Sequence, residues 1–362
     1  MRVLHVIARL NIGGTARYIT QLANELPKHG IETFVATGFV QGSEVEDPSA
    51  QSIDLIRIRS LGRSFNPLKD HLARKQLEKI IQEVKPDIIH THTFKAGYIA
   101  RMKKQSVPVV HTFHGHLLDD PEFSGFKSRV IIALEKMMAT KTAKLVTVGE
   151  NVGQELLHHH IGVKEQYLSI PPGVVALEIT PRAQALKNLG IEESDQPIIG
   201  WIARVTGVKN PLRALAVARA LPNTHFIMAG GGDLLEDVRA TAPSNVSVIG
   251  WAQAEDVLGA SEIILSTSDN EGMPVALIEA QLAGKPVVAT DVGSVSEVVA
   301  NHETGLVTNT HPNSIAAAVT TLLLDAHKRT SMSTLAASRA RSLFSVERMI
   351  NAHLGLYRSI VK

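Results

Sequence analysis

Short apolar runs alternate along this chain with longer segments in which apolar residues recur at helical spacing. Runs of this kind are typical of buried parallel strands, and the amphipathic segments between them are typical of helices that cover both faces of a sheet. In the first half we expect strands at 3–8, 33–37, 55–58, 88–92, 108–113 and 145–148, and helices at 15–28, 66–84, 95–104 and 126–143.

The second half repeats this alternation, with strands expected at 198–203, 226–229, 246–250, 263–266, 286–289 and 306–307. Pro171-Pro172-Gly173 lies between the two halves, and such a cluster of helix and strand breakers indicates a linker. The pattern therefore predicts an α/β chain with two Rossmann-like domains, 1–172 and 173–344, followed by a helical segment from 345 to the end.

Two glutamates lie in a predicted strand-loop-helix-strand unit at 263–290. Pro274 suits the first turn of a helix, so the helix is expected to open near Met273. Helical side chains lean toward the N-terminus, which would turn Glu279 back toward the loop that carries Glu271. Free peptide N–H groups and the helix dipole at that point favour a bound phosphate. These N–H groups belong to Gly272, Met273, Val275 and Ala276.

The simpler interpretation is that Glu271 is an exposed loop acid and Glu279 a solvated helix position, since charged residues usually stay in water. The neighbours of Glu279 are apolar, however, and an unpartnered charge among them would be costly.

This segment resembles the E-x7-E signature of the retaining glycosyltransferases of family 4, with Gly284-Lys285-Pro286 after it. The resemblance implies the GT-B fold, in which two Rossmann-like domains face each other across a cleft and the terminal helix, here 345–362, packs back on the N-terminal domain. It also implies that Glu271 holds hydroxyls of a donor sugar and that Glu279 holds the ribose of its nucleotide.

Arg204 and Lys209 follow a predicted strand with the family's R-x4-K spacing. By resemblance they hold the donor diphosphate, on which negative charge builds as the sugar leaves; two exposed loop cations are the plainer interpretation. There is no D-x-D motif and no His/Cys cluster with metal-ligand spacing, so we expect these cations to replace a metal ion, with no cofactor. We expect the acidic and the basic pair to line opposite edges of one cavity.

Further donor contacts are predicted at glycine turns after strands, where the backbone can approach a phosphate. Gly14 belongs to a Gly-Gly pair after the first strand. Gly230 and Gly232 resemble the family's G-x-G turn, and Trp251 follows a strand end where the family holds the base. Each of these could also be a simple turn.

His114 closes a segment, 109–116, that resembles the family's H-T-F-H-G-H block, and the resemblance places it against donor sugar and acceptor. It could orient hydroxyls or share a proton, and we favour it over His111 and His116. His90 and His92 share one face of a predicted strand and could equally be buried core residues. The run His158-His159-His160 is expected at a solvated helix end.

Composition narrows the function further. The absence of cysteine excludes disulfides, thiolate metal sites and a cysteine nucleophile. Residues 1–172 carry 22 Lys and Arg against 17 Asp and Glu, and residues 173–362 carry 15 against 18. The excess of basic residues in 1–172 would allow peripheral contact with an anionic membrane, although a solvated surface explains it too. With 4% aromatic residues in the chain, this excess does not indicate nucleic-acid binding.

Residues 1–9 contain His5 and Arg9 and resemble no signal peptide, and the uncharged run near 304–324 is too polar to span a membrane, so we expect a cytoplasmic protein.

The resemblance, which covers nearly the whole chain, implies a retaining, metal-independent glycosyltransferase with front-face displacement. It would move a sugar from a nucleoside diphosphate donor, with UDP favoured by the His114 block, to a hydroxyl of a sugar or lipid-linked saccharide in polysaccharide or glycoconjugate assembly. Two alternatives remain: a sugar-nucleotide epimerase, and a two-lobed sugar-binding protein without chemistry. Pro172 and Gly149-Glu150 depart from the family's usual Asn and Ser.

Overall fold

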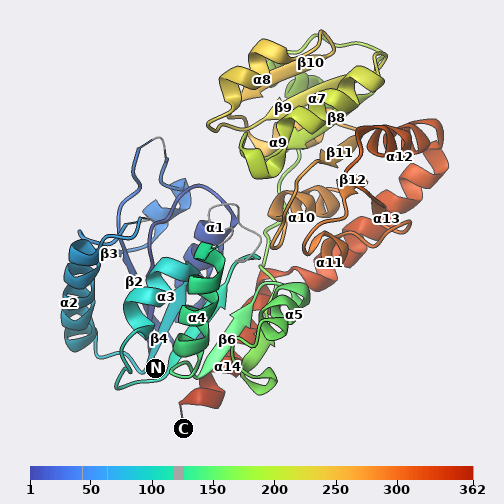
Figure 1. Ribbon diagram of the computed structural model, residues 1–362. Helices are drawn as coiled ribbons and strands as arrows, with labels where there is room; N and C mark the ends of the chain where they lie inside the picture. The colour runs from blue at the N-terminus through green and yellow to red at the C-terminus, as the bar shows by residue number, and fades with distance from the viewer. Residues whose placement is uncertain (43, 63, 117–125, 362) are drawn as a thin grey trace. The chain divides into compact units, whose positions relative to one another are not determined.

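The computed structural model describes residues 1–42, 44–62, 64–116 and 126–361 (Figure 1). The chain divides into two compact units. Unit 1 comprises Met1–Gly173 and Val346–Lys362, and unit 2 comprises Val174–Ser345. The division thus follows Pro171-Pro172-Gly173, and the last helix belongs to unit 1.

The described residues of unit 1 form a seven-stranded parallel sheet in the order β3-β2-β1-β4-β5-β6-β7. Its strands are β1 (Arg2–Ile7), β2 (Glu32–Thr37), β3 (Leu55–Arg57), β4 (Ile88–His92), β5 (Val109–Phe113), β6 (Lys144–Thr147) and β7 (Tyr167–Ser169). Its α-helices are α1 (Gly14–Glu25), α2 (Pro67–Val84), α3 (Thr93–Arg101), α4 (Phe126–Ala139), α5 (Glu150–His158) and α14 (Val346–Ile360).

Unit 2 forms a six-stranded parallel sheet in the order β10-β9-β8-β11-β12-β13. The strands are β8 (Ile198–Ile202), β9 (His225–Ala229), β10 (Val246–Gly250), β11 (Ile263–Ser266), β12 (Val287–Thr290) and β13 (Gly305–Thr308). The α-helices are α6 (Arg182–Leu189), α7 (Pro211–Ala220), α8 (Leu235–Thr241), α9 (Ala254–Ala260), α10 (Val275–Leu282), α11 (Val295–Val298), α12 (Pro312–Leu324) and α13 (Ala326–Leu343). The expected α/β class is confirmed for both units.

Several predicted boundaries differ from the structure. Helix α4 ends at Ala139, not at 143, because Ala143 already donates its backbone N–H to Val109 O in the neighbouring strand, 2.8 Å away. A 3₁₀ helix at Pro48–Ser52 and strand β7 were not predicted. By contrast α2 begins as expected, with the Asn66 side chain accepting the Lys69 N–H and Pro67 in the first turn.

The two faces of the unit 1 sheet differ in polarity. Leu4, Val6 and Ile89 lie in an aliphatic core with Leu77 of α2 and Ile99 of α3. Because strand side chains alternate, His5, His90 and His92 lie on the opposite face, where α1 and α14 contribute further buried polar side chains. The C-terminal helix is thus held to unit 1 by specific hydrogen bonds as well as by apolar packing.

Among the described residues, no helix has the length and apolar composition that crossing a bilayer requires.

Candidate active site

Each sheet has one point where the order of its strands reverses, and open α/β sheets bind ligands beyond the carboxyl ends of the strands at that point. In unit 2 the reversal lies between β8 and β11, and in unit 1 between β1 and β4. The loops after β8 and β11 carry Arg204, Lys209 and Glu271. In unit 1, His5 lies on β1 and His92 ends β4. The predicted residues Arg204, Lys209 and Glu271 therefore lie where the topology of unit 2 favours a ligand, and in unit 1 the corresponding place is occupied by His5 and His92.

Lys209 and Glu271 form an ion pair in unit 2. The ammonium Nζ of Lys209 lies 2.6 Å from Glu271 Oε1, and the Ser268 hydroxyl donates to the same oxygen over 2.7 Å. The expectation that acid and base line opposite edges of a cavity was wrong for this pair, because the loops after adjacent strands bring them into contact. Glu271 is 8% exposed and Glu279 is 7% exposed, so neither is the solvated acid of the simpler interpretation.

The backbone at Lys209 is held by residues that sequence reasoning missed. The Thr267 hydroxyl lies 3.1 Å from Lys209 O and 3.0 Å from Asn210 O, and the Trp201 indole N–H donates to that hydroxyl over 3.0 Å. The Arg213 guanidinium lies 2.7 Å from Asp269 Oδ1, which ties the start of α7 to the loop after β11. Single polar residues at strand ends carry little sequence signal, and only their contacts identify them as supports for Lys209.

Glu279 is the fifth residue of α10, and most of that helix is buried. The helix starts at Val275 with Pro274 as its N-cap, slightly later than predicted. Met273 and Pro274 are buried, whereas Gly272 and Val275 are partly exposed. The short loop before α10 therefore leaves backbone near its N-terminus within reach of a ligand.

The glycine turn after β9 packs directly on the loop that carries Arg204. A Cβ on Gly230 would lie 1.8 Å from Ala203 O, and one on Gly232 would lie 2.3 Å from Val205 O. Gly230 also has a φ of +143°, in the region that side chains disfavour. Between them, Gly231 approaches the indole of Trp251, a residue that is 57% exposed. Glycine is thus required here, and the turn brings Trp251 and the exposed Arg204 to one edge.

In unit 1 the Gly-Gly pair is placed as predicted, but the unusual backbone belongs to Gly13 and not to Gly14. Gly13 has a φ of +146°, and its N–H donates to Asp47 Oδ2 over 3.2 Å, while Gly14 begins α1. The turn is therefore tied to the segment that precedes β3.

His114 follows β5 and is partly buried. Its Nε2 lies 3.0 Å from His92 Nδ1, and its ring meets the edge of Tyr18 at a centroid distance of 5.0 Å. Burial, helped by the charge that His353 would carry, lowers the pKa of His114 to about 3. His114 is consequently neutral near pH 7, and so low a pKa favours the role of orienting a ligand over that of sharing a proton.

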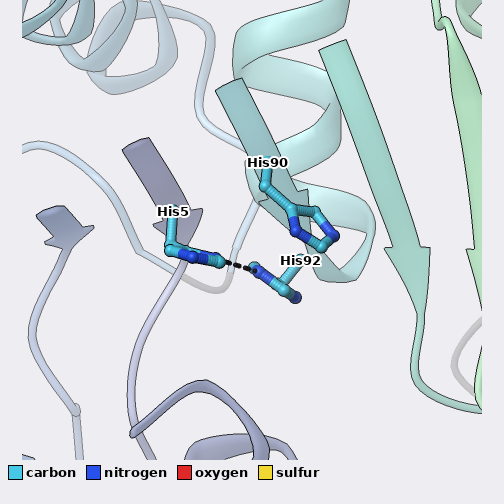
Figure 2. Close-up of side chains that lie close together, drawn as sticks. All are labelled: His5, His90 and His92. Atoms are coloured by element: carbon cyan, nitrogen blue, oxygen red, sulfur yellow. Dashed lines mark hydrogen bonds between the residues drawn. The ribbon is translucent and has the colours of Figure 1, made fainter. Parts of the chain in front are cut away.

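His90 and His92 are fully buried, as the alternative interpretation required. His90 bonds to Tyr357 Oη over 2.6 Å through Nδ1 and to Thr112 Oγ1 over 2.7 Å through Nε2. His92 Nε2 lies 3.0 Å from His5 Nδ1, which is the bond drawn in Figure 2. Burial, then the charges of neighbouring histidines, keep the pKa values of His90 and His92 well below 6.5.

His5, His90, His92 and His114 form a cluster with Tyr18, His353 and Tyr357. The other histidines of unit 1 lie outside this cluster. His111 bonds to Thr91 Oγ1 over 2.8 Å on the opposite face of the sheet, and His116 pairs with Glu155. His158 is exposed at the end of α5, which confirms the prediction of a solvated helix end. Sequence reasoning did not assign His5, Tyr18, His353 and Tyr357 to the cluster. Their signal was faint: a histidine interrupting the apolar first strand, and two polar rings on the apolar side of the last helix.

Both halves of the chain match family models. Residues 12–176 match "Glycosyltransferase Family 4", and residues 185–339 match "Glycosyl transferases group 1". A relative from Escherichia coli, named UDP-Gal:alpha-D-GlcNAc-diphosphoundecaprenol alpha-1,3-galactosyltransferase, is 25% identical over 84% of this chain and 83% of its own length.

Solved structures with the same fold include sucrose-phosphate synthase from Thermosynechococcus elongatus, at a TM-score of 0.84 with 18% identity and 99% of both chains covered. The Anabaena protein HepE in complex with UDP and glucose has a TM-score of 0.81 and 18% identity, with 99% of this chain and 100% of that chain covered. The two parallel sheets and these likenesses confirm the GT-B fold. The chain therefore belongs to glycosyltransferase family 4 and is a glycosyltransferase.

Proposed function

We propose that the protein transfers a sugar from a UDP-sugar to a hydroxyl of a saccharide acceptor, with retention of anomeric configuration and without a metal ion. The observation that carries this proposal is the edge of the unit 2 sheet where an exposed Arg204, the Lys209–Glu271 pair, the glycine turn and Trp251 meet. UDP is supported by the names of the Escherichia coli relative and of the HepE complex.

The cations of unit 2 suit a diphosphate leaving group. Arg204 is exposed and has a planar fork of N–H donors, which matches phosphate oxygens. Lys209 has three ammonium protons, so it can keep its bond to Glu271 and still donate to a phosphate. Positive groups held in place before the reaction stabilise the charge that develops as the sugar to phosphate bond breaks.

The two buried glutamates suit the hydroxyls of the donor. Within the described part of the chain, the hydrogen bonds to the Glu271 carboxylate both go to Oε1, which leaves Oε2 to accept from a sugar hydroxyl. Glu279 is proposed to hold the ribose. A front-face displacement completes the proposal, with a leaving phosphate oxygen taking the acceptor proton, because the neutral His114 is a poor proton carrier near pH 7.

One assay separates the proposal from its alternatives. The protein is mixed with UDP- and GDP-sugars, with and without saccharide acceptors, and nucleotide diphosphate release and product configuration are followed by NMR. We expect UDP release that rises with acceptor, a retained anomeric centre and no loss with a chelator.

Isomerised donor in the absence of acceptor would indicate an epimerase, and binding without release would indicate a sugar-binding protein; the similarities favour neither. Loss of activity after addition of a chelator would contradict the proposal that transfer needs no metal ion.

We also propose that unit 1 contacts an anionic membrane at the cytoplasmic face through the start of α2. Phe65, Leu68 and Leu72 are 50%, 79% and 51% exposed, and Leu68 and Leu72 lie one turn apart. Lys69 and Lys75 are exposed beside them. Apolar side chains with flanking lysines are what an interfacial helix presents to anionic lipid. A lipid-linked acceptor, as in the name of the Escherichia coli relative, would make such contact useful.

Vesicle sedimentation tests the membrane contact. The intact protein should sediment with vesicles that contain a third of anionic phospholipid and not with zwitterionic vesicles, and Leu68→Asp with Leu72→Asp should abolish this. Leu324→Asp, at an 83% exposed leucine of unit 2, is the matched control. Equal sedimentation of both variants would contradict the use of α2.

A further inference from the structure

His5, His92 and His114 form a continuous hydrogen-bonded line through unit 1. His5 Nδ1 lies 3.0 Å from His92 Nε2, and His92 Nδ1 lies 3.0 Å from His114 Nε2. His92 therefore uses both ring nitrogens to join a buried residue of β1 to the residue that follows β5. We call these three residues the histidine line.

The ends of the histidine line differ. His5 Nε2 is buried and has no hydrogen-bond partner among the described residues. His114 is partly exposed, and within the same residues its Nδ1 takes part in no hydrogen bond. One end of the histidine line is thus a fully buried nitrogen, and the other end belongs to a partly exposed residue.

The number of ring protons links the protonation of His5 Nε2 to that of His114 Nδ1. Three neutral imidazoles carry three ring protons, and each hydrogen bond of the line requires one of them. The third proton must sit at one end, on His5 Nε2 or on His114 Nδ1. In protein backbones, buried N–H groups without an acceptor are rarer than carbonyl groups that lack a donor, and we infer the same preference for these ring nitrogens. The structure therefore favours the arrangement in which the proton is on His114 Nδ1.

A metal ion is the other use for this cluster, since nitrogens of His5, His90 and His92 lie within 4.8 Å of one another. The hydrogen bonds argue against it. Both nitrogens of His90 are bonded to Tyr357 and Thr112, and both nitrogens of His92 belong to the histidine line. The His90 and His92 rings also lie close together, with centroids 4.2 Å apart and their planes tilted by 31° (Figure 2).

We propose that His92 and His5 are positioning residues that set the tautomer of His114, so that His114 presents an Nδ1–H donor to the substrate. The substrate end of this inference rests on the proposed transferase function. A fixed donor selects a ligand oxygen that accepts a hydrogen bond, such as a sugar hydroxyl or a phosphate oxygen, and disfavours a protonated amine. His114 alone is the residue that touches substrate, and the other two act through it.

The test reads the tautomer directly and needs no substrate. The full chain is labelled with ¹⁵N at histidine, and the Nδ1 and Nε2 shifts of His114 are measured near pH 7, with His114→Gln used for assignment. We expect Nδ1 protonated and Nε2 unprotonated in the wild type. His92→Phe keeps the ring but breaks the line, and should give His114 as a mixture of tautomers. His92→Gln, whose amide can accept at one end and donate at the other, should restore much of the single tautomer.

Kinetics complete the test. His92→Phe should lower kcat/KM by about tenfold, the size expected for one misdirected hydrogen bond, and His92→Gln should recover part of it. His111→Asn is the matched control, because it removes a buried histidine outside the histidine line and should leave the His114 shifts unchanged.

A wild-type His114 protonated at Nε2, or a tautomer that His92→Phe leaves unaltered, would overturn the inference. If the protein moved no sugar at all, the transferase proposal would fail while the NMR result still decided the tautomer.

Discussion

The two units build their candidate sites from opposite kinds of side chain, although both place them where the strand order reverses. Unit 2 uses charged groups near its surface, with Lys209 paired to Glu271 and Arg204 exposed. Unit 1 uses a cluster of buried, neutral histidines with two tyrosines. Charged side chains at the solvent-exposed edge of the sheet can bind a diphosphate without rearrangement. A neutral imidazole can select a ligand only through the direction of its hydrogen bond. Its orientation must therefore be fixed by neighbouring side chains, and such contacts require burial.

The comparison predicts that unit 1 unfolds at a higher pH than unit 2 as the solution is acidified. This is the largest expected effect. Burial lowers the pKa values of His5 and His114 from 6.5 to about 3, with a smaller contribution from the charge that His353 would carry. Burial also lowers the pKa of His353 to about 4, against a smaller opposing contribution from its hydrogen bond to the Met349 backbone. The unfolded chain therefore binds protons that the folded unit does not. Stability is full above about pH 6.5 and falls toward pH 3, by about 1.4 kcal/mol per pH unit for each such histidine.

Hydrogen exchange on the intact protein at pH 7.5 and 5.5 would measure this unit by unit. In unit 2 the only described histidine with a lowered pKa is the half-buried His225, so its protection should change less. Equal losses of protection in both units would break the comparison.

Loss of the Lys209 ammonium is the next largest effect. Lys209→Ala should lower kcat by about a hundredfold, because the positive group that we propose lies beside the leaving diphosphate is lost. The variant also leaves the buried Glu271 without its cation, so the melting temperature must be measured together with the rate.

Lys209→Ala combined with Glu271→Gln tests whether the lost stability comes from the uncompensated charge, since it removes that charge. Recovery of the melting temperature without recovery of the rate is the expected result. Wild-type turnover in either variant would remove Lys209 from the site.

Glu279→Ala should have a smaller effect, at least about tenfold in kcat/KM, because it would remove the proposed hydrogen bonds to the ribose and leave the proposed diphosphate contacts in place. The loss should appear mainly in the KM for the donor. The nearby Gln281→Ala is a control for cavity formation in α10, as Gln281 is fully buried and bonded to Thr304. Equal losses in both variants would indicate that Glu279 acts only through packing.

Much of unit 2 could be predicted because its functional residues lie in short continuous segments. Strand, loop and helix follow one another within 263–282, so the spacing of Glu271, Pro274 and Glu279 already implies their local arrangement. The glycines at 230–232 were recognised as a turn, although only the structure shows that a Cβ there would strike Ala203 O and Val205 O.

The contact between Lys209 and Glu271 could not be predicted. The two residues are separated by 62 positions in the sequence, and their loops meet only because β8 and β11 are neighbours in the sheet.

By itself the sequence determined the alternation of strands and helices, the break near residue 173, and the family to which the glutamate and cation motifs point. Such features depend on residues close together in the chain, where periodicity and backbone preferences act. Only the tertiary structure decided that His5, His92 and His114 form one line, and that Tyr357 of the last helix closes on His90. A buried polar residue acquires its role from its partners, and here these partners come from segments up to 267 positions apart.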